Sequence, residues 1–138
     1  MEKVIKIGLL GSGTVGSGVI QVLEMNRPQI TERVGTPIEI KTVLVRDVKK
    51  PRPQLGDVRL TDKIEDILDD PEIDVVVELM GGIHPAREYM LRAMEAGKSI
   101  LLVAQKSAAK DEPVSEDLYD IGCIANILQM LKLPDGTV

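Results

Sequence analysis

The segment from Val4 to Gly16 constrains the fold more than any other part of the chain. A short apolar run there passes directly into Gly11, Gly13 and Gly16, at the spacing G-x-G-x-x-G, and an amphipathic stretch follows over residues 14–24. This order predicts a buried strand, a tight turn and the first turn of a helix. In such a unit the first glycine permits the turn, the second lets a pyrophosphate approach the backbone, and the third lets the helix pack close to the strand.

The same turn is typical of an anion-binding site. The first amide groups of an α-helix have no partner inside the helix, and the helix dipole favours negative charge at that end. The alternative is a glycine-rich turn with no ligand, but the strand before it and the helix after it favour a dinucleotide site. We therefore expect the pyrophosphate of a dinucleotide to be held by the residues of the turn, which are Gly11, Ser12, Gly13, Thr14, Val15 and Gly16.

The rest of the pattern predicts an α/β fold. Apolar or β-branched segments that are typical of strands recur along the chain, at 38–45, 58–60, 73–79 and 100–103. Helical patterns separate most of these segments, and strands joined through helices run parallel with right-handed crossovers. We expect a Rossmann-like doubly wound parallel sheet with an atypical C-terminal extension. The expected division is a dinucleotide-binding domain over residues 1–106 and a tail over residues 107–138 that is not an independent domain.

The end of the second expected strand bears on the choice of cofactor. In dinucleotide-binding folds an acid at this place binds the ribose hydroxyls of NAD, whereas an arginine accommodates the extra phosphate of NADP. This chain has Arg46 and Asp47 there, with Lys49 and Lys50 close behind. The pattern favours NADP, or the use of both NADP and NAD. The alternative is that this basic loop is only a solvated surface.

Composition argues against several other functions. The net charge is −5, and the chain has two Tyr, no Phe and no Trp, so a nucleic-acid partner is not expected. His84 is the only histidine and Cys123 the only cysteine, and we expect no metal site. We expect His84 to be a cap or an exposed polar residue, with a place at the cofactor edge as the alternative, and Cys123 to be a small buried hydrophobe. No signal peptide or membrane-spanning run is present, so we expect a cytoplasmic protein with no membrane partner.

Residues 3–98 resemble the N-terminal NAD(P)-binding domain of homoserine dehydrogenase. The resemblance is carried by four stretches, at residues 5–19, 43–47, 74–82 and 85–89. It implies the oxidation of L-homoserine, or the reduction of L-aspartate 4-semialdehyde, with NAD or NADP. It also implies that the glycine turn holds the pyrophosphate, that Arg46 meets the adenosine ribose or its phosphate, and that Gly81 and Gly82 lie near the nicotinamide.

Residues 99–138 are similar instead to a fragment of the N-terminal substrate-recognition domain of Lon-type ATP-dependent proteases. Where homoserine dehydrogenases have an Ala-Asn-Lys motif, this chain has Ala104-Gln105-Lys106. Lys106 is therefore a candidate for the lysine of that motif, and a surface lysine is the favoured alternative. The apolar stretch 121–133 fits a strand or a helix. A natural fusion, a misassembled gene and an engineered chimera would all show this pattern.

Two hypotheses about function follow. The first is an NAD(P)-binding domain of homoserine dehydrogenase type that binds a nicotinamide dinucleotide but lacks the catalytic domain and is inactive alone, because hydride transfer requires both reactants to be held in contact. The second is a binding or structural module that self-associates as a homodimer through its Lon-like tail, since an unpaired apolar strand favours association.

Overall fold

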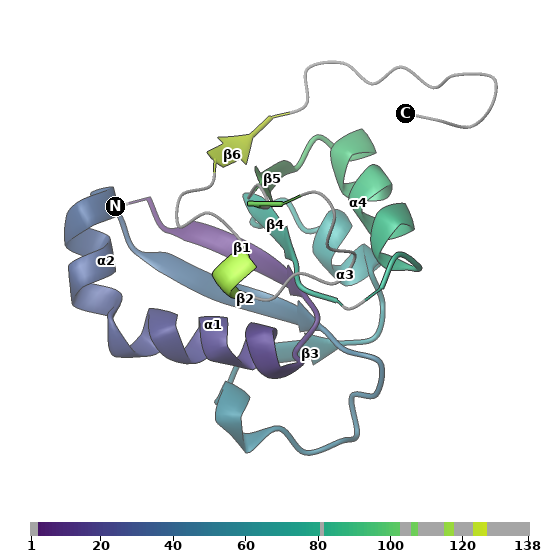
Figure 1. Ribbon diagram of the computed structural model, residues 1–138, viewed down its shortest axis with the longest axis horizontal. Helices are drawn as coiled ribbons and strands as arrows, with labels where there is room; N and C mark the ends of the chain where they lie inside the picture. Colours follow the sequence, from purple (N-terminus) through teal and green to yellow (C-terminus); the bar gives the residue numbers. More distant parts are fainter. Residues whose placement is uncertain (1–2, 81, 103–105, 108–114, 118–122, 127–138) are drawn as a thin grey trace.

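The computed structural model describes residues 3–80, 82–102, 106–107, 115–117 and 123–126. Within these residues the strands form a single six-stranded sheet in the order β3-β2-β1-β4-β5-β6 (Figure 1). The strands are β1 (Ile5–Leu10), β2 (Ile38–Leu44), β3 (Arg59–Thr61), β4 (Val75–Glu78), β5 (Ser99–Leu102) and β6 (Cys123–Ala125). Neighbouring strands from β3 to β5 pair in parallel, and β6 pairs antiparallel with β5. The expected Rossmann-like sheet is confirmed.

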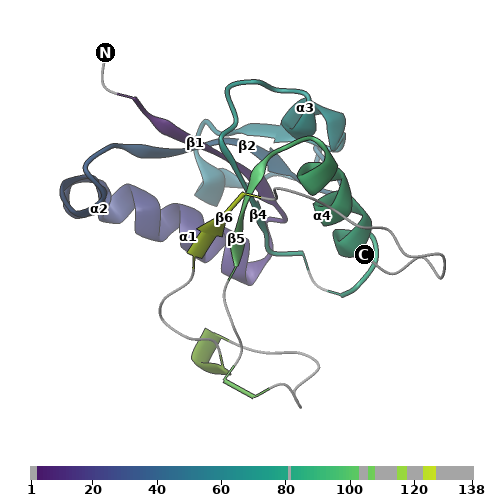
Figure 2. The ribbon, with the colours of Figure 1, turned by 90° about the horizontal axis from the view of Figure 1, so that it is seen from above.

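Helices cover both faces of this sheet (Figure 2). The elements between the strands are α1 (Thr14–Met25), α2 (Arg27–Val34), the 3-10 helix η1 (Pro53–Leu55), α3 (Glu65–Leu68) and α4 (Ala86–Glu95), and a second 3-10 turn, η2, spans Ser115–Asp117. Side chains of α1 and η1 pack on one face, whereas those of α3 and α4 pack on the other. The chain changes face between β3 and β4, as the doubly wound topology requires.

The core consists of two aliphatic clusters separated by the sheet. On the α1 side, Leu9 packs with Ile20 of α1 and Leu55 of η1. On the α4 side, the next residue, Leu10, packs with Ile67 of α3 and with other buried residues. Successive residues of a strand point to opposite faces, so β1 contributes to both clusters. Leu9 and Leu10 are completely buried, which makes β1 the central element of the fold.

The connection after α1 contains a helix, α2, with Pro28 in its first turn, where proline is tolerated. Cys123 is exposed rather than buried, since β6 lies at the edge of the sheet. The apolar stretch 121–133 contributes a strand at Cys123–Ala125, and its residues 121–122 and 127–133 lie outside the described residues.

An ion-pair network joins the strands at the edge opposite the glycine turn. The Nζ atom of Lys41 lies 2.6 Å from Oδ2 of Asp70 and also contacts the carboxylate of Glu72. Lys6 of β1 contacts Glu72 as well, at 3.2 Å. The hydrogen bonds from Lys41 hold the pKa values of Asp70 and Glu72 below their ordinary range, and the two carboxylates raise the pKa of Lys41. The network fastens the loop before β4 to β1 and β2.

We expect the variant Lys41→Met to lose stability at neutral pH and to show a flatter dependence of stability on pH. Carboxylates whose pKa is lower in the folded state stabilise the fold above their unfolded pKa of about 4, and this contribution disappears as the pH falls through the lower folded value. Urea unfolding at pH about 7 and about 3 measures the change. Lys63→Met is the control, because the Lys63 side chain makes no ion pair among the described residues. Equal pH dependence in both variants would contradict the expectation.

Candidate functional site

The glycine turn begins at Gly11, at the carboxyl end of β1. Its backbone has a φ of 102°, which L side chains rarely adopt, and its N–H donates to the carbonyl of Leu44 at 3.0 Å. A Cβ atom built there would lie 2.8 Å from the carbonyl oxygen of Leu79. Backbone conformation and close contact therefore both require glycine at this position.

Gly16 and Gly13 are explained in different ways. A Cβ at Gly16 would lie 2.4 Å from the carbonyl oxygen of Gly11, so the approach of α1 to β1 requires glycine here. A Cβ at Gly13 would meet no atom of the described chain within 4 Å. Its backbone, with φ −69° and ψ −161°, is also open to other residues. Packing within the chain thus accounts for the outer two glycines and leaves open space at the middle one.

The N-terminus of α1 presents free amide groups beside this space. The helical hydrogen bonds begin with the N–H of Ser17, which donates to the carbonyl of Gly13 at 2.9 Å. No side chain caps the helix, and its first turn contains no acidic residue. Within the described residues the N–H groups of 14–16 therefore have no partner. Free amides at the positive end of a helix dipole form a site for an anion.

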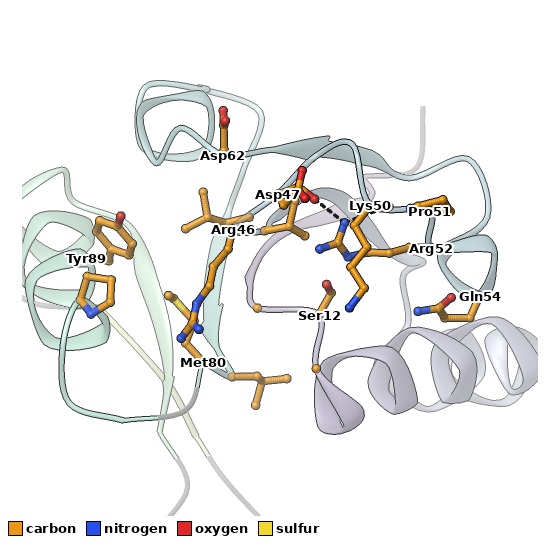
Figure 3. A pocket seen from close by; sticks show the side chains of 16 residues that line it. Ser12, Arg46, Asp47, Lys50, Pro51, Arg52, Gln54, Asp62, Met80 and Tyr89 are labelled. Carbon is orange, nitrogen blue, oxygen red and sulfur yellow. Dashed lines mark hydrogen bonds between the residues drawn. The ribbon is translucent and has the colours of Figure 1, made fainter.

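A cavity of about 700 Å³ lies beyond the carboxyl ends of the strands (Figure 3). The glycine turn borders it, the segment after β2 forms one wall, and the segment from β4 into α4 forms the other. In Figure 3 the side chain of Arg46 extends between Ser12 on one side and Met80 and Tyr89 on the other. The residues that line the cavity are Gly11, Ser12, Gly13, Leu44, Val45, Arg46, Asp47, Lys50, Pro51, Arg52, Gln54, Asp62, Leu79, Met80, Pro85 and Tyr89. The volume lies within the usual range for cofactor sites.

The structure brings some of the predicted site residues to this cavity and leaves others outside it. The predicted residues that line the cavity are Gly11, Ser12, Gly13, Arg46 and Lys50. Gly16 lies behind them against Gly11. The other predicted residues that the structure describes do not line it; these are Thr14, Val15, Lys49, Gly82 and Lys106. Gly81 lies outside the described residues.

Lys106 is held in a local contact of its own. Its Nζ atom donates to the carbonyl of Glu116 at 2.9 Å, and its backbone N–H donates to the carbonyl of Asp117 at 2.7 Å. The side chain thus caps the short turn η2. Nothing among these contacts relates Lys106 to the cavity.

Several residues that line the cavity were not identified from the sequence. Arg52 belongs to the basic segment after β2, and its positive charge was the one feature of the sequence that could have indicated a place at the cavity. Asp62 follows β3, which pairs with β2 and so ends at the same edge. Tyr89 lies in α4, and no local pattern distinguishes it from a core residue. These residues become neighbours only through the folding of distant segments onto one edge.

His84 is exposed and does not line the cavity, as expected for an exposed polar residue. Its Nδ1 atom pairs with Oε1 of Glu88. A hydrogen bond from its own backbone N–H, with a further contribution from His84, lowers the pKa of Glu88. The pair lies on the outer surface at the start of α4.

The described part of the chain contains no group of three or more His, Cys, Asp or Glu side chains arranged to hold a metal ion. None of its helices combines the length and the apolar character needed to cross a bilayer.

Strand order, glycine turn and cavity together define a dinucleotide-binding domain of the Rossmann type. The sequence model of the homoserine dehydrogenase NAD-binding domain matches residues 11–122, and the chain belongs to this family. It is 40% identical to a homoserine dehydrogenase of Bacillus subtilis over 100 residues, which are 72% of this chain and 23% of that protein. A crystal structure of S. aureus homoserine dehydrogenase superimposes with a TM-score of 0.68 at 42% identity, covering 72% of this chain and 25% of that one.

The similarity to homoserine dehydrogenases continues beyond residue 98. The family model extends to residue 122. A homoserine dehydrogenase of Synechocystis is 44% identical over 133 residues, which are 96% of this chain and 30% of that protein. The chain therefore spans about a quarter to a third of the length of such relatives.

Gly16→Ala is expected to destabilise the domain by about 1–3 kcal/mol, because the added methyl group would overlap the carbonyl oxygen of Gly11 and force α1 away from β1. Urea unfolding followed by circular dichroism measures the loss. Gly18→Ala, in the same helix, is the matched control, since its Cβ would meet no atom within 4 Å. That control should be about 0.5–1 kcal/mol more stable than the native chain. Equal stability of the two variants would refute the close approach of α1.

Proposed function

We propose that this chain binds a nicotinamide dinucleotide in the cavity, with the pyrophosphate on the amide groups at the start of α1. The supporting observation is the open space at Gly13. Chain packing does not require glycine there, whereas a pyrophosphate lying against the backbone would. Family membership supports the same class of ligand.

The adenosine end of the dinucleotide would lie toward the segment after β2. Arg46 and Lys50 line this part of the cavity, and their positive charge suits the additional phosphate of NADP. Asp47 also lines it and is the acid that could serve NAD. The nicotinamide would lie toward Gly81 and Gly82, as the family resemblance implies. We propose NADP or NAD as the cofactor and keep the binding residues expected from the sequence, which are Gly11, Ser12, Gly13, Thr14, Val15, Gly16, Arg46, Lys49, Lys50, Gly81 and Gly82.

The activity we propose for the complete enzyme is the interconversion of L-homoserine and L-aspartate 4-semialdehyde. Its support is the set of relatives that are homoserine dehydrogenases. In this proposal the present domain holds the cofactor, and a substrate site is required in addition, because hydride transfer needs both reactants in contact. The division at residue 106, the role of Lys106, the similarity of residues 99–138 to Lon-type proteases and the homodimer stay predictions.

A pair of glycine variants tests the binding proposal. Gly13→Ala should weaken binding of NADH and NADPH by about tenfold or more, because the methyl group would occupy the space of the pyrophosphate. Gly18→Ala should bind like the native chain. Both substitutions add one methyl group where no atom of the described chain lies within 4 Å, so neither should disrupt the fold. Titration of nucleotide fluorescence measures the affinities, and thermal unfolding verifies that both variants are folded.

Two results would contradict the proposal. One is the absence of nucleotide binding by the folded native chain. The other is native affinity in Gly13→Ala, since the pyrophosphate would then lie elsewhere.

A further inference from the structure

The segment from Arg46 to Arg52 carries an unusual concentration of positive charge at the cavity. It contains Arg46, Lys49, Lys50 and Arg52, against the single acid Asp47. Three of the four cations, Arg46, Lys50 and Arg52, line the cavity. The side chains of Arg46 and Lys50 make no hydrogen bond or ion pair with any described residue. These two side chains have no other partner there, whereas Nη1 of Arg52 is already engaged within the loop.

Arg52 is engaged by the loop itself. Its Nη1 atom donates to the carbonyl of Asp47 at 2.7 Å and to the carbonyl of Lys50 at 2.9 Å, as the dashed lines in Figure 3 indicate. Hydrogen bonds from a charged donor are stronger than neutral ones. One half-buried side chain thus holds the preceding backbone at two points, Asp47 and Lys50. Pro51 and Pro53 flank Arg52 and restrict the chain further, since proline fixes its own φ and limits the preceding residue.

Asp47 is also used in shaping the loop. Its Oδ1 atom accepts the backbone N–H of Lys49 at 2.9 Å, which forms a local turn. In folds that select NAD, the acid after the second strand instead accepts the ribose hydroxyls. Here one oxygen of Asp47, the only acid in segment 46–52, accepts a hydrogen bond within the turn, while Arg46 and Lys50 line the cavity unpaired.

We propose that Arg52 is a positioning residue that holds this loop in the shape that selects NADP(H) over NAD(H). It acts on the cofactor through the backbone carbonyls of Asp47 and Lys50 and so presents Arg46 and Lys50 to the 2′-phosphate. A loop held by hydrogen bonds of its own loses less entropy when the cofactor binds. This inference rests on the proposed function, because it specifies the cofactor of the same cavity.

The test compares Arg52→Met with Arg52→Lys and with the control Arg33→Met. Arg33 is an exposed arginine of α2 that does not line the cavity. We expect Arg52→Met to raise the Kd for NADPH by about tenfold while the Kd for NADH changes by less than about threefold. Arg52→Lys keeps a donor nitrogen and should show a smaller loss. The control should bind both nucleotides like the native chain.

Limited digestion with trypsin, without nucleotide, reports the shape of the loop independently. Cleavage after Arg46 and Lys49 should be faster in Arg52→Met than in the native chain and the control. Lys50 and Arg52 are followed by proline, which blocks cleavage there, so the substitution itself removes no cleavage site.

The possible results separate this inference from the proposed function. If Arg52→Met loses NADPH affinity while its cleavage by trypsin is unchanged, Arg52 contacts the phosphate directly. If Arg52→Met loses affinity for NADPH and NADH equally, the loop does not select between them. Either result overturns the inference and leaves nucleotide binding intact. If the native chain binds neither nucleotide, the proposed function and the selection both fail. The cleavage rates then still show whether Arg52 holds the loop.

Discussion

The close approach of α1 to β1 is the contact on which the rest of the structure depends. It is possible only because Gly16 brings no side chain between the helix and the carbonyl of Gly11. That approach buries Ile20 against Leu9 and so completes the core on one face of the sheet. It also places the free amide groups at the start of α1 next to Gly13, which lines the cavity. Packing and anion binding therefore follow from the same backbone contact.

The two edges of the sheet have different roles. At the carboxyl ends of the strands, the glycine turn and the segment after β2 leave amides and cations free for a ligand. At the amino ends, lysines and carboxylates neutralise one another, with Lys41 between Asp70 and Glu72. The unpaired cations Arg46 and Lys50 thus lie on the side where a dinucleotide phosphate would compensate them, and the ion pairs on the opposite side fasten the strands.

The sequence predicted the features that depend on local patterns. The strand, turn and helix around Gly11 could be identified because apolar periodicity and glycine spacing act over a few residues. Features that depend on distant contacts could not. Tyr89 reaches the cavity only because α4 follows a strand paired with β1, and Arg52 shows its role only when its partners, two backbone carbonyls, are in place. Cys123 was misjudged because no local pattern reveals that β6 is an edge strand.

The basic segment after β2 is connected to the cavity but contributes nothing to either core cluster between Arg46 and Arg52. If this segment selects the nucleotide as proposed, substitutions in it change that selection at little cost to folding. In a domain built in this way, the choice between the two nicotinamide dinucleotides can change during evolution through substitutions in one short charged loop at the surface. The inherited scaffold, which would be far harder to change, can stay as it is.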